Sequence, residues 1–200
     1  MQEFVTVVES VKPDVIGTEN WRNDDIFDSE FSILGFSMFR ADRKNSHRGV
    51  GVLLLVNTCM NAMEVMLKSQ FVDQVWCRIK LKCGEDLLIG VCNRSPTPEF
   101  SDQQNDDILC DLLTELYGKP LLLMGDFNYP DIDWSSSCGH SPASQKFVDA
   151  VDGAFLTQHV ATGTRNEAIL DLVITSEPDM IDAISVLDKL TTICSNGMSV

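Results

Sequence analysis

The sequence has no hydrophobic run long enough to cross a membrane and no surplus of basic residues. No apolar stretch approaches the roughly 20 residues that a membrane-spanning helix needs. Lys and Arg number 15 against 30 Asp and Glu, so the formal net charge is -15. Most of the excess lies in residues 101–200, where 16 acidic residues outnumber 4 basic ones. This balance argues against a broad basic footprint for nucleic acid. Acidic residues gathered around one site would suit a divalent cation, although a solvated acidic surface explains most of these charges.

Paired cysteines, a secretory signal and internal repeats are also missing. The seven cysteines are odd in number, widely spaced and free of any C-x-x-C pair. Together with the absence of a signal peptide, they predict reduced thiols in an intracellular protein, nuclear or cytoplasmic, that is neither secreted nor bound to a membrane. The segment Cys138-Gly139-His140 would supply two metal ligands and lacks the other two. Length and a hydrophobic content of 44% predict a single globular domain over residues 1–200.

The most informative segment runs from Pro120 to Pro130 and reads P-L-L-L-M-G-D-F-N-Y-P. Its uncharged first half predicts a strand that is buried on both faces. An acid and an amide, Asp126 and Asn128, follow directly, and α/β proteins build active sites just past the carboxyl end of such strands. The alternative interpretation is a simple turn, because Gly-Asp and Asn-Tyr-Pro are turn-forming in their own right.

Hydrophobic periodicity predicts more strands than helices. Helices are expected over about 4–11, 106–117 and 144–151. Strands are expected over 15–17, 33–39, 50–56, 75–81, 87–92, 121–124, 170–174 and 181–186. Hairpin-like pairs come early and strand–helix alternation comes later. This order favours a mixed α/β protein with sheets covered by helices over a doubly wound parallel sheet.

Three acidic residues stand in or directly after predicted strands: Glu19, Asp126 and Asp171. Each alone has an ordinary structural explanation, namely a solvated loop acid, a turn residue and an inward polar group satisfied by backbone amides. Together with Asn128 they suggest a phosphoryl-transfer site that uses a hard metal ion. In such a site one carboxylate holds Mg²⁺, a second acid handles water, and an amide donates to the transition-state oxygens.

Five segments resemble the exonuclease–endonuclease–phosphatase superfamily, and specifically the endonuclease domain of non-LTR retrotransposons. They occur in the family's order and together cover nearly the whole chain. The segments are P-D-V-I-G-T-E-N-W (13–21), R-G-V-G-V-L-L-L-V (48–56), I-G-V-C-N-R-S-P (89–96), G-D-F-N-Y-P-D-I-D-W (125–134) and L-D-L-V-I-T (170–175). One G-D-F-N would be weak evidence, whereas five ordered segments are strong evidence.

The resemblance implies an α/β (α+β) four-layer sandwich of two packed mixed β-sheets flanked by helices. It also implies Mg²⁺-dependent cleavage of DNA, with Mn²⁺ as an alternative cation, to free the 3′ hydroxyl from which reverse transcription starts. By position, Glu19 matches the metal-binding glutamate and Asp126 the aspartate that handles the attacking water. Asn128 matches the asparagine that stabilises the pentacovalent phosphorus, and Asp171 the aspartate that orients the catalytic histidine.

The chain departs from the family pattern at several positions. Asn93 stands where the family has a tyrosine that donates to the phosphate, and Ser195-Asn196-Gly197 stands where it has Ser-Asp-His. The family's first strand, which carries an asparagine, and its C-terminal Asp-His strand are expected to be absent, as is a reverse transcriptase domain. His47, His140 and His159 lie outside every matching segment and are expected to be surface residues.

These departures predict a retroelement-derived endonuclease domain that is inactive or strongly impaired. Losing one group that positions the nucleophile or neutralises charge costs a factor of roughly 10²–10⁴, and such losses do not add. The rival interpretation is a non-enzymatic remnant or binding module that keeps the fold. Unused site residues would be free to drift, so the retained Glu19, Asp126, Asn128 and Asp171 favour recent decay of an enzyme over long adaptation to binding. Lipid phosphodiesterases, inositol phosphatases and RNA deadenylases of the superfamily rank below the retroelement branch.

Overall fold

The computed structural model describes residues 8, 10–20, 33–41, 51–95, 101–165, 167–187 and 190–194. The strands are β1 (Val15–Asn20), β2 (Phe36–Ala41), β3 (Gly51–Asn57), β4 (Met63–Glu64), β5 (Gln74–Lys80), β6 (Asp86–Cys92), β7 (Leu121–Asp126), β8 (Ile132–Asp133), β9 (Cys138–Gly139), β10 (Thr157–Gln158), β11 (Asp171–Thr175), β12 (Ala183–Leu187) and β13 (Leu190–Cys194). The helices are α2 (Asp102–Leu116) and α3 (Pro142–Gly153), with 3₁₀ turns η2 (Thr58–Met60) and η3 (Pro178–Met180).

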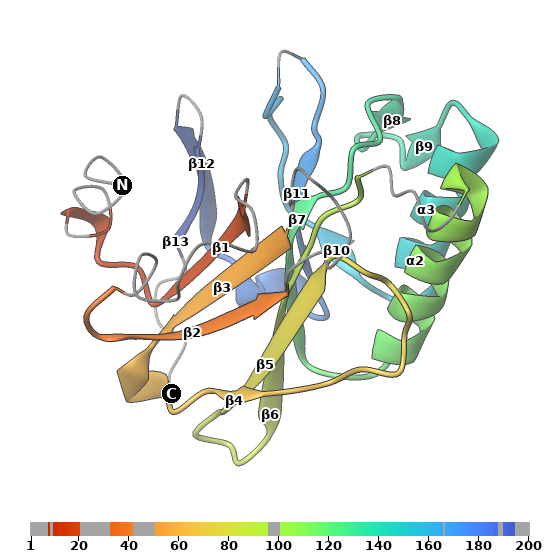
Figure 1. The fold of residues 1–200 in the computed structure, drawn as a ribbon. Helices are drawn as coiled ribbons and strands as arrows, with labels where there is room; N and C mark the ends of the chain where they lie inside the picture. The colour runs from red at the N-terminus through yellow and green to blue at the C-terminus, as the bar shows by residue number, and fades with distance from the viewer. Residues whose placement is uncertain are drawn as a thin grey trace.

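Two sheets form the centre of the molecule (Figure 1). The first is antiparallel, in the order β1-β3-β2, and the second has six strands in the order β10-β11-β7-β6-β5-β4. Within the second sheet β6 and β7 run parallel, and the other neighbours are antiparallel. The two sheets pack against each other, and α2 and α3 cover the other face of the second sheet (Figure 1).

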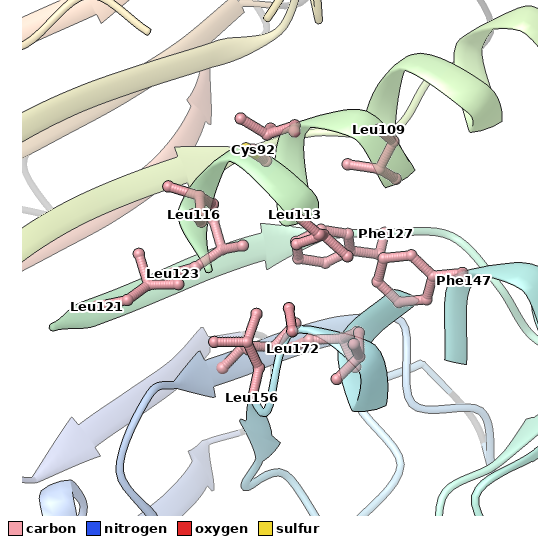
Figure 2. Close-up of a cluster of buried hydrophobic side chains, with 14 of the residues drawn as sticks. Cys92, Leu109, Leu113, Leu116, Leu121, Leu123, Phe127, Phe147, Leu156 and Leu172 are labelled. Carbon is pink, nitrogen blue, oxygen red and sulfur yellow. The ribbon is translucent and has the colours of Figure 1, made fainter. Parts of the chain in front are cut away.

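Side-chain alternation along the strands separates two hydrophobic cores. In β7, Leu122 and Met124 face the first sheet and meet Val52 and Leu54 of β3. The alternate residues Leu121 and Leu123 face the opposite way and belong to the second core. There they pack against the leucines of α2 and Phe147 of α3 (Figure 2). A strand buried on both faces reads as a continuous apolar run, which is why the sequence predicted β7 correctly.

Gly17 allows β1 of the first sheet to lie directly over β7 of the second. A Cβ atom at Gly17 would come within 2.6 Å of Met124 Sδ and 2.7 Å of Val91 Cγ2, closer than real carbon atoms approach. The absence of a side chain therefore sets the separation of the two sheets at this point.

Both long helices begin at capping boxes that the hydrophobic pattern did not reveal. The Ser101 hydroxyl accepts the Gln104 N–H, and the Gln104 side chain accepts the Ser101 N–H. With this cap, α2 begins at Asp102, four residues before the predicted start at Asp106. The prediction began too late because the first turn of the helix is polar and carries no apolar periodicity. Ser141 and Ser144 make the equivalent box for α3, with Pro142 at the first helical position.

The predicted fold class is confirmed: two packed sheets with helices outside. Of the predicted first helix the structure describes Val8, Ser10 and Val11, which are helical. Strand β1 runs to Asn20, beyond the predicted end at Gly17, because it pairs along its whole length with β3. The sequence did not predict β13, which forms a hairpin with β12. In the described part of the chain no helix is long and apolar enough to span a bilayer.

Candidate active site

The end of β7 approaches β6 so closely that only glycine fits at position 125. Gly125 has a φ of 143°, and a Cβ atom there would lie 1.8 Å from the carbonyl oxygen of Cys92. The first residue of the G-D-F-N segment is therefore required by backbone packing. Its consequence is that the residues after β7 stay in contact with the residues after β6.

Phe127 anchors the segment between the acid and the amide. Its ring is 1% exposed and lies 5.3 Å from the ring of Phe147, centroid to centroid (Figure 2). Its N–H donates to the Leu170 carbonyl at 2.9 Å. The core therefore fixes Phe127, and with it the positions of its two chain neighbours, Asp126 and Asn128.

Asp126 and Asn128 form a local turn that is also a cluster of polar groups. Asn128 has a left-handed backbone, with φ of 48°, which asparagine tolerates better than most residues. Its N–H donates to Asp126 Oδ1 at 2.8 Å, as in an Asx turn. The predicted turn is therefore present, and it holds Asp126 and Asn128 close together, while the active-site interpretation stays a prediction. Among the described residues, none hydrogen-bonds to the side-chain amide of Asn128.

Asp171 lies directly opposite Asp126 on the neighbouring strand. The two are partners in the antiparallel register of β7 and β11. They therefore project from the same face of the sheet, the face that Met124 and Val173 turn towards β1 and β3. The Thr164 hydroxyl accepts the N–H groups of Leu170 and Asp171, each at 3.1 Å. The Asp171 carboxylate itself accepts no hydrogen bond from the described residues.

Burial and the neighbouring acid both disfavour the charged form of Asp126. Burial raises the pKa of this carboxyl, and the negative charge of Asp171 raises it further. Arg165, whose Nη2 lies 3.2 Å from Asp126 Oδ2, and the Asn128 N–H work in the opposite direction. The Arg165 side chain is 58% exposed, so solvent screens this ion pair. A raised pKa brings Asp126 closer to the range of a useful general base.

Asn93 follows the end of β6 and is buried beside this cluster. Its N–H donates to the Asp73 carbonyl at 2.9 Å. The next residue, Arg94, donates its own N–H to the carbonyl oxygen of Asp126 at 2.8 Å. The backbone thus joins the position of the family's tyrosine to the G-D-F-N turn.

Sequence reasoning missed a buried network formed by Arg94, Asp106 and Tyr129. Arg94 Nε donates to Asp106 Oδ1 at 2.6 Å, and the guanidinium carbon lies 4.1 Å from the centroid of the Tyr129 ring. The Tyr129 hydroxyl donates to the same Asp106 oxygen at 2.8 Å. Burial strongly raises the pKa of Tyr129, so its hydroxyl stays protonated and remains a donor. Asp106 shares a helix face with Leu109 and Leu113. An acidic residue on that apolar face was the signal in the sequence that could have revealed a buried ion pair.

Arg165 was also missed, although it is the single basic residue between Lys146 and Lys189 in a strongly acidic half. Nothing in its spacing connects it with Asp126, 39 residues earlier. A bridge between Arg165 and Ala168 closes the turn that brings it there.

The proposed metal ligand Glu19 is described in its backbone, and its side chain lies outside the described part. Glu19 pairs with Val52 of β3. Strands β1 and β7 touch at Gly17 and Met124. Glu19 lies two residues after Gly17 in β1, and Asp126 lies two residues after Met124 in β7.

None of the described histidines lies at the cluster. His159 is half-buried, contrary to the expected surface position, because its Nε2 lies 2.6 Å from the Thr175 hydroxyl. Thr175 is four residues from Asp171 along β11, about 13 Å away. His140 is exposed as expected, and His47 and residues 195–197 lie outside the described residues. Among the described side chains, no three of His, Cys, Asp and Glu gather closely enough to hold a metal by themselves.

Several solved structures share this fold. The endonuclease domain of TRAS1, a telomere-specific non-LTR retrotransposon, superimposes with a TM-score of 0.66 at 12% identity, covering 95% of this chain and 85% of that chain. The human Nocturnin catalytic domain gives 0.60 at 17% identity, covering 93% and 78%. The 3′ phosphatase NExo from Neisseria, bound to a product DNA hairpin, gives 0.57 at 13% identity, covering 92% and 84%. The chain thus has the fold of the exonuclease–endonuclease–phosphatase superfamily.

A sequence family described as endonuclease-reverse transcriptase matches residues 88–196, more than half of the chain. The protein belongs to this family, and the resemblance inferred from the five segments is confirmed. No curated protein matches the sequence.

Proposed function

We propose that this protein is a retroelement-derived DNA endonuclease domain that binds Mg²⁺ and DNA and hydrolyses phosphodiesters at a strongly reduced rate. The observation that carries the proposal is the direct pairing of Asp126 with Asp171 at the end of β7, beside Asn128. Two acids placed opposite each other weaken a sheet. A bound cation, alone or together with a substrate, would offset the repulsion between the two carboxylates.

Each residue of the cluster has a distinct part in the proposed reaction. Asp126, with its raised pKa, takes the proton of the attacking water. The side-chain amide of Asn128, which has no described protein partner, donates to the oxygens of the pentacovalent phosphorus. In the family pattern Asp171 orients a histidine, and here its carboxylate adds negative charge beside Asp126.

The donor set fits a hard cation. Glu19 and Asp171 would offer carboxylate oxygens, and Mg²⁺ typically binds one or two carboxylates together with substrate phosphates and water. Mn²⁺ would be accepted by the same oxygen ligands. When bound, the cation neutralises developing charge on the phosphoryl oxygens. The Asp171 carboxylate, without a hydrogen-bond donor among the described residues, is consistent with such a ligand.

The reduced rate follows from two substitutions in the family pattern. Asn93 replaces the tyrosine donor, and its shorter amide does not reach as far as a phenol. Asn196-Gly197 replaces the Asp-His pair. The second candidate, a non-enzymatic module that retains the fold, is favoured by the same two substitutions. DNA cleavage by a repaired variant distinguishes the candidates.

Nicking of supercoiled plasmid in Mg²⁺ tests the proposal. The natural chain should nick barely faster than buffer, and Asn93→Tyr should raise the rate at least about tenfold, since a lost donor of this kind costs roughly 10²–10³. Adding Asp126→Ala to Asn93→Tyr should abolish the gain, whereas adding the exposed Asp152→Ala should preserve it. Fast Mg²⁺-dependent nicking by the natural chain, abolished by Asp126→Ala, would refute the reduced rate. Absence of any gain in Asn93→Tyr would favour the non-enzymatic module.

Metal binding is tested separately by thermal unfolding. Mg²⁺ should raise the melting temperature with an affinity on the order of millimolar, since a site with few carboxylates leaves the ion largely hydrated. Glu19→Gln should remove most of this shift. An equal shift in the variant would show that Glu19 is not a ligand.

A further inference from the structure

The Arg94 side chain ends on the backbone of the turn that carries Asp126 and Asn128. Its Nη1 donates to the Asn128 carbonyl at 3.1 Å, while its Nε donates to Asp106. Its backbone N–H donates to the Asp126 carbonyl at 2.8 Å. One residue thus binds the peptide group that precedes Phe127 and the peptide group that follows Asn128.

We propose that Arg94 is a positioning residue that, held by Asp106 and Tyr129, sets Asp126 and Asn128 in their reactive arrangement before substrate binds. This inference rests on the proposed endonuclease function, because it gives those two residues a reaction to perform. It adds a role for a side chain to which the resemblance assigned none.

The geometry at position 94 requires arginine, and another basic residue would not replace it. Nε and Nη1 point to different acceptors, Asp106 and Asn128, while the flat face of the guanidinium lies on the Tyr129 ring. Arginine satisfies all three contacts with one rigid planar group. A lysine ammonium carries its three donors on one nitrogen, so it does not offer two separated donor atoms on a flat group that also lies on the ring.

The network holds a backbone conformation that few residues adopt. A left-handed φ is uncommon for a residue with a side chain, although asparagine tolerates it better than most. Two bonds hold Asn128 in that conformation: its N–H donates to Asp126 Oδ1, and its carbonyl accepts Arg94 Nη1. The Phe127 anchor holds the turn from the core side. Arg94 adds a second restraint, because it lies on the Tyr129 ring, which packs on the same Phe147.

Fold stability alone does not account for such a pair. Arg94 and Asp106 are largely buried, with side chains 18% and 6% exposed. Buried ion pairs often contribute little net stability compared with apolar residues of similar size. A hydrogen-bonded network that ends on a catalytic turn has a purpose in pre-organisation, which lowers the cost of aligning groups during the reaction.

Amide hydrogen exchange on the intact chain tests the proposal without DNA or metal. In Arg94→Lys, exchange of the Asn128 amide should accelerate at least about tenfold relative to that of Leu123 in the core. Arg78→Lys is the matched control, because Arg78 also pairs with an aspartate, Asp86, at 3.0 Å, at the opposite end of the sheet. That variant should leave the ratio of the two amides unchanged. Equal acceleration of both amides in Arg94→Lys, or of neither, would overturn the proposal.

The coupling between the amide and α protons of Asn128, measured by NMR, gives a second readout that a merely structural role would not move, because it reports the φ that the network holds. Arg94→Lys should change this coupling, since the bond from Nη1 to the Asn128 carbonyl is lost. Tyr129→Phe should act in the same direction with a smaller change, and it replaces Arg94→Lys if that variant does not fold. An unchanged coupling in a folded variant would refute the positioning role. Failure of the nuclease assays would refute the proposed function and leave these two measurements interpretable.

Discussion

Asp126 and Asp171 are register partners across β7 and β11, so two carboxylates of the same charge share one face of the sheet. The described cation beside Asp126 is Arg165, which is mostly exposed. The last residue of β7 and the first residue of β11 thus place a like-charge pair at the edge of the core. Two like charges placed opposite each other weaken a sheet in the free protein, and a bound cation is the use that we propose for them.

Replacing Asp171 with Asn should stabilise the metal-free protein. Removing one of two directly opposed like charges should add about 0.2–1 kcal/mol to the free energy of unfolding, measured by urea denaturation. Asp152→Asn, at an exposed position of α3, is the control and should change little. Saturating Mg²⁺ should reverse the order, because the natural pair holds the cation better. A less stable Asp171→Asn protein without metal would contradict this account.

Arg165→Gln should move the titration of Asp126 to higher pH. Removing the guanidinium takes away the positive charge that partly offsets burial and Asp171, so the pKa of Asp126 should rise further. The acid limb of nicking, followed in the Asn93→Tyr background, should shift to higher pH with it. Arg165→Lys should stay close to the natural chain, and a shift to lower pH in Arg165→Gln would refute the assignment.

The raised pKa of Asp126 also predicts how the free energy of unfolding changes with pH. A carboxyl whose pKa is higher in the folded state contributes stability that is fully present below its unfolded pKa and is lost as pH rises through the folded pKa. Arg165→Gln should therefore lose more stability than Arg165→Lys between mildly acidic and neutral pH.

Two glycine substitutions should have opposite effects. Gly125→Ala places a Cβ against the Cys92 carbonyl at a positive φ, so we expect a loss of at least about 3 kcal/mol or failure to fold. Gly153→Ala, at the end of α3, has open space around the new Cβ and should gain about 0.4–1 kcal/mol. Thermal unfolding of the two variants measures both effects. A stable Gly125→Ala protein would show that β6 and β7 can separate at this point.

The cysteines should divide into reactive and unreactive groups. Cys59 and Cys83 are exposed, whereas Cys77, Cys92 and Cys110 are buried free thiols. Burial raises the pKa of Cys77 to about 12 and that of Cys110 to about 11, which keeps them in the unreactive thiol form. Mass spectrometry after brief treatment with a thiol reagent should therefore find the exposed pair modified first. Early modification of Cys77 would show that the sheets open readily.

Much of the fold could be predicted from the sequence because the signals are local. The apolar run of β7 reflects burial on both faces, and the turn at Gly84 joins β5 to β6 as expected. The boundaries were less accurate where polar residues start an element. The beginning of α2 depends on a capping box and not on the apolar stripe.

The candidate site could be predicted only in part. Asp126, Asn128 and Asp171 follow or open strands in recognisable segments, and the structure brings these three together through the β7–β11 pairing and the G-D-F-N turn. Asn93 joins them through the backbone of Arg94. Which residues surround them was hidden, because Asp106 looks like one more acid of an acidic chain until α2 packs it against Arg94.

The family, the two-sheet architecture and the acids at the strand ends could be inferred from the sequence, because strand burial and motif order depend on consecutive residues. The facing of Asp126 and Asp171, the contact of Arg94 with the turn, and the distance of His159 from the cluster became visible only in the folded chain. Those relationships depend on register and on packing between elements 12 to 45 residues apart. A register shift of one residue would turn either acid to the other face of the sheet.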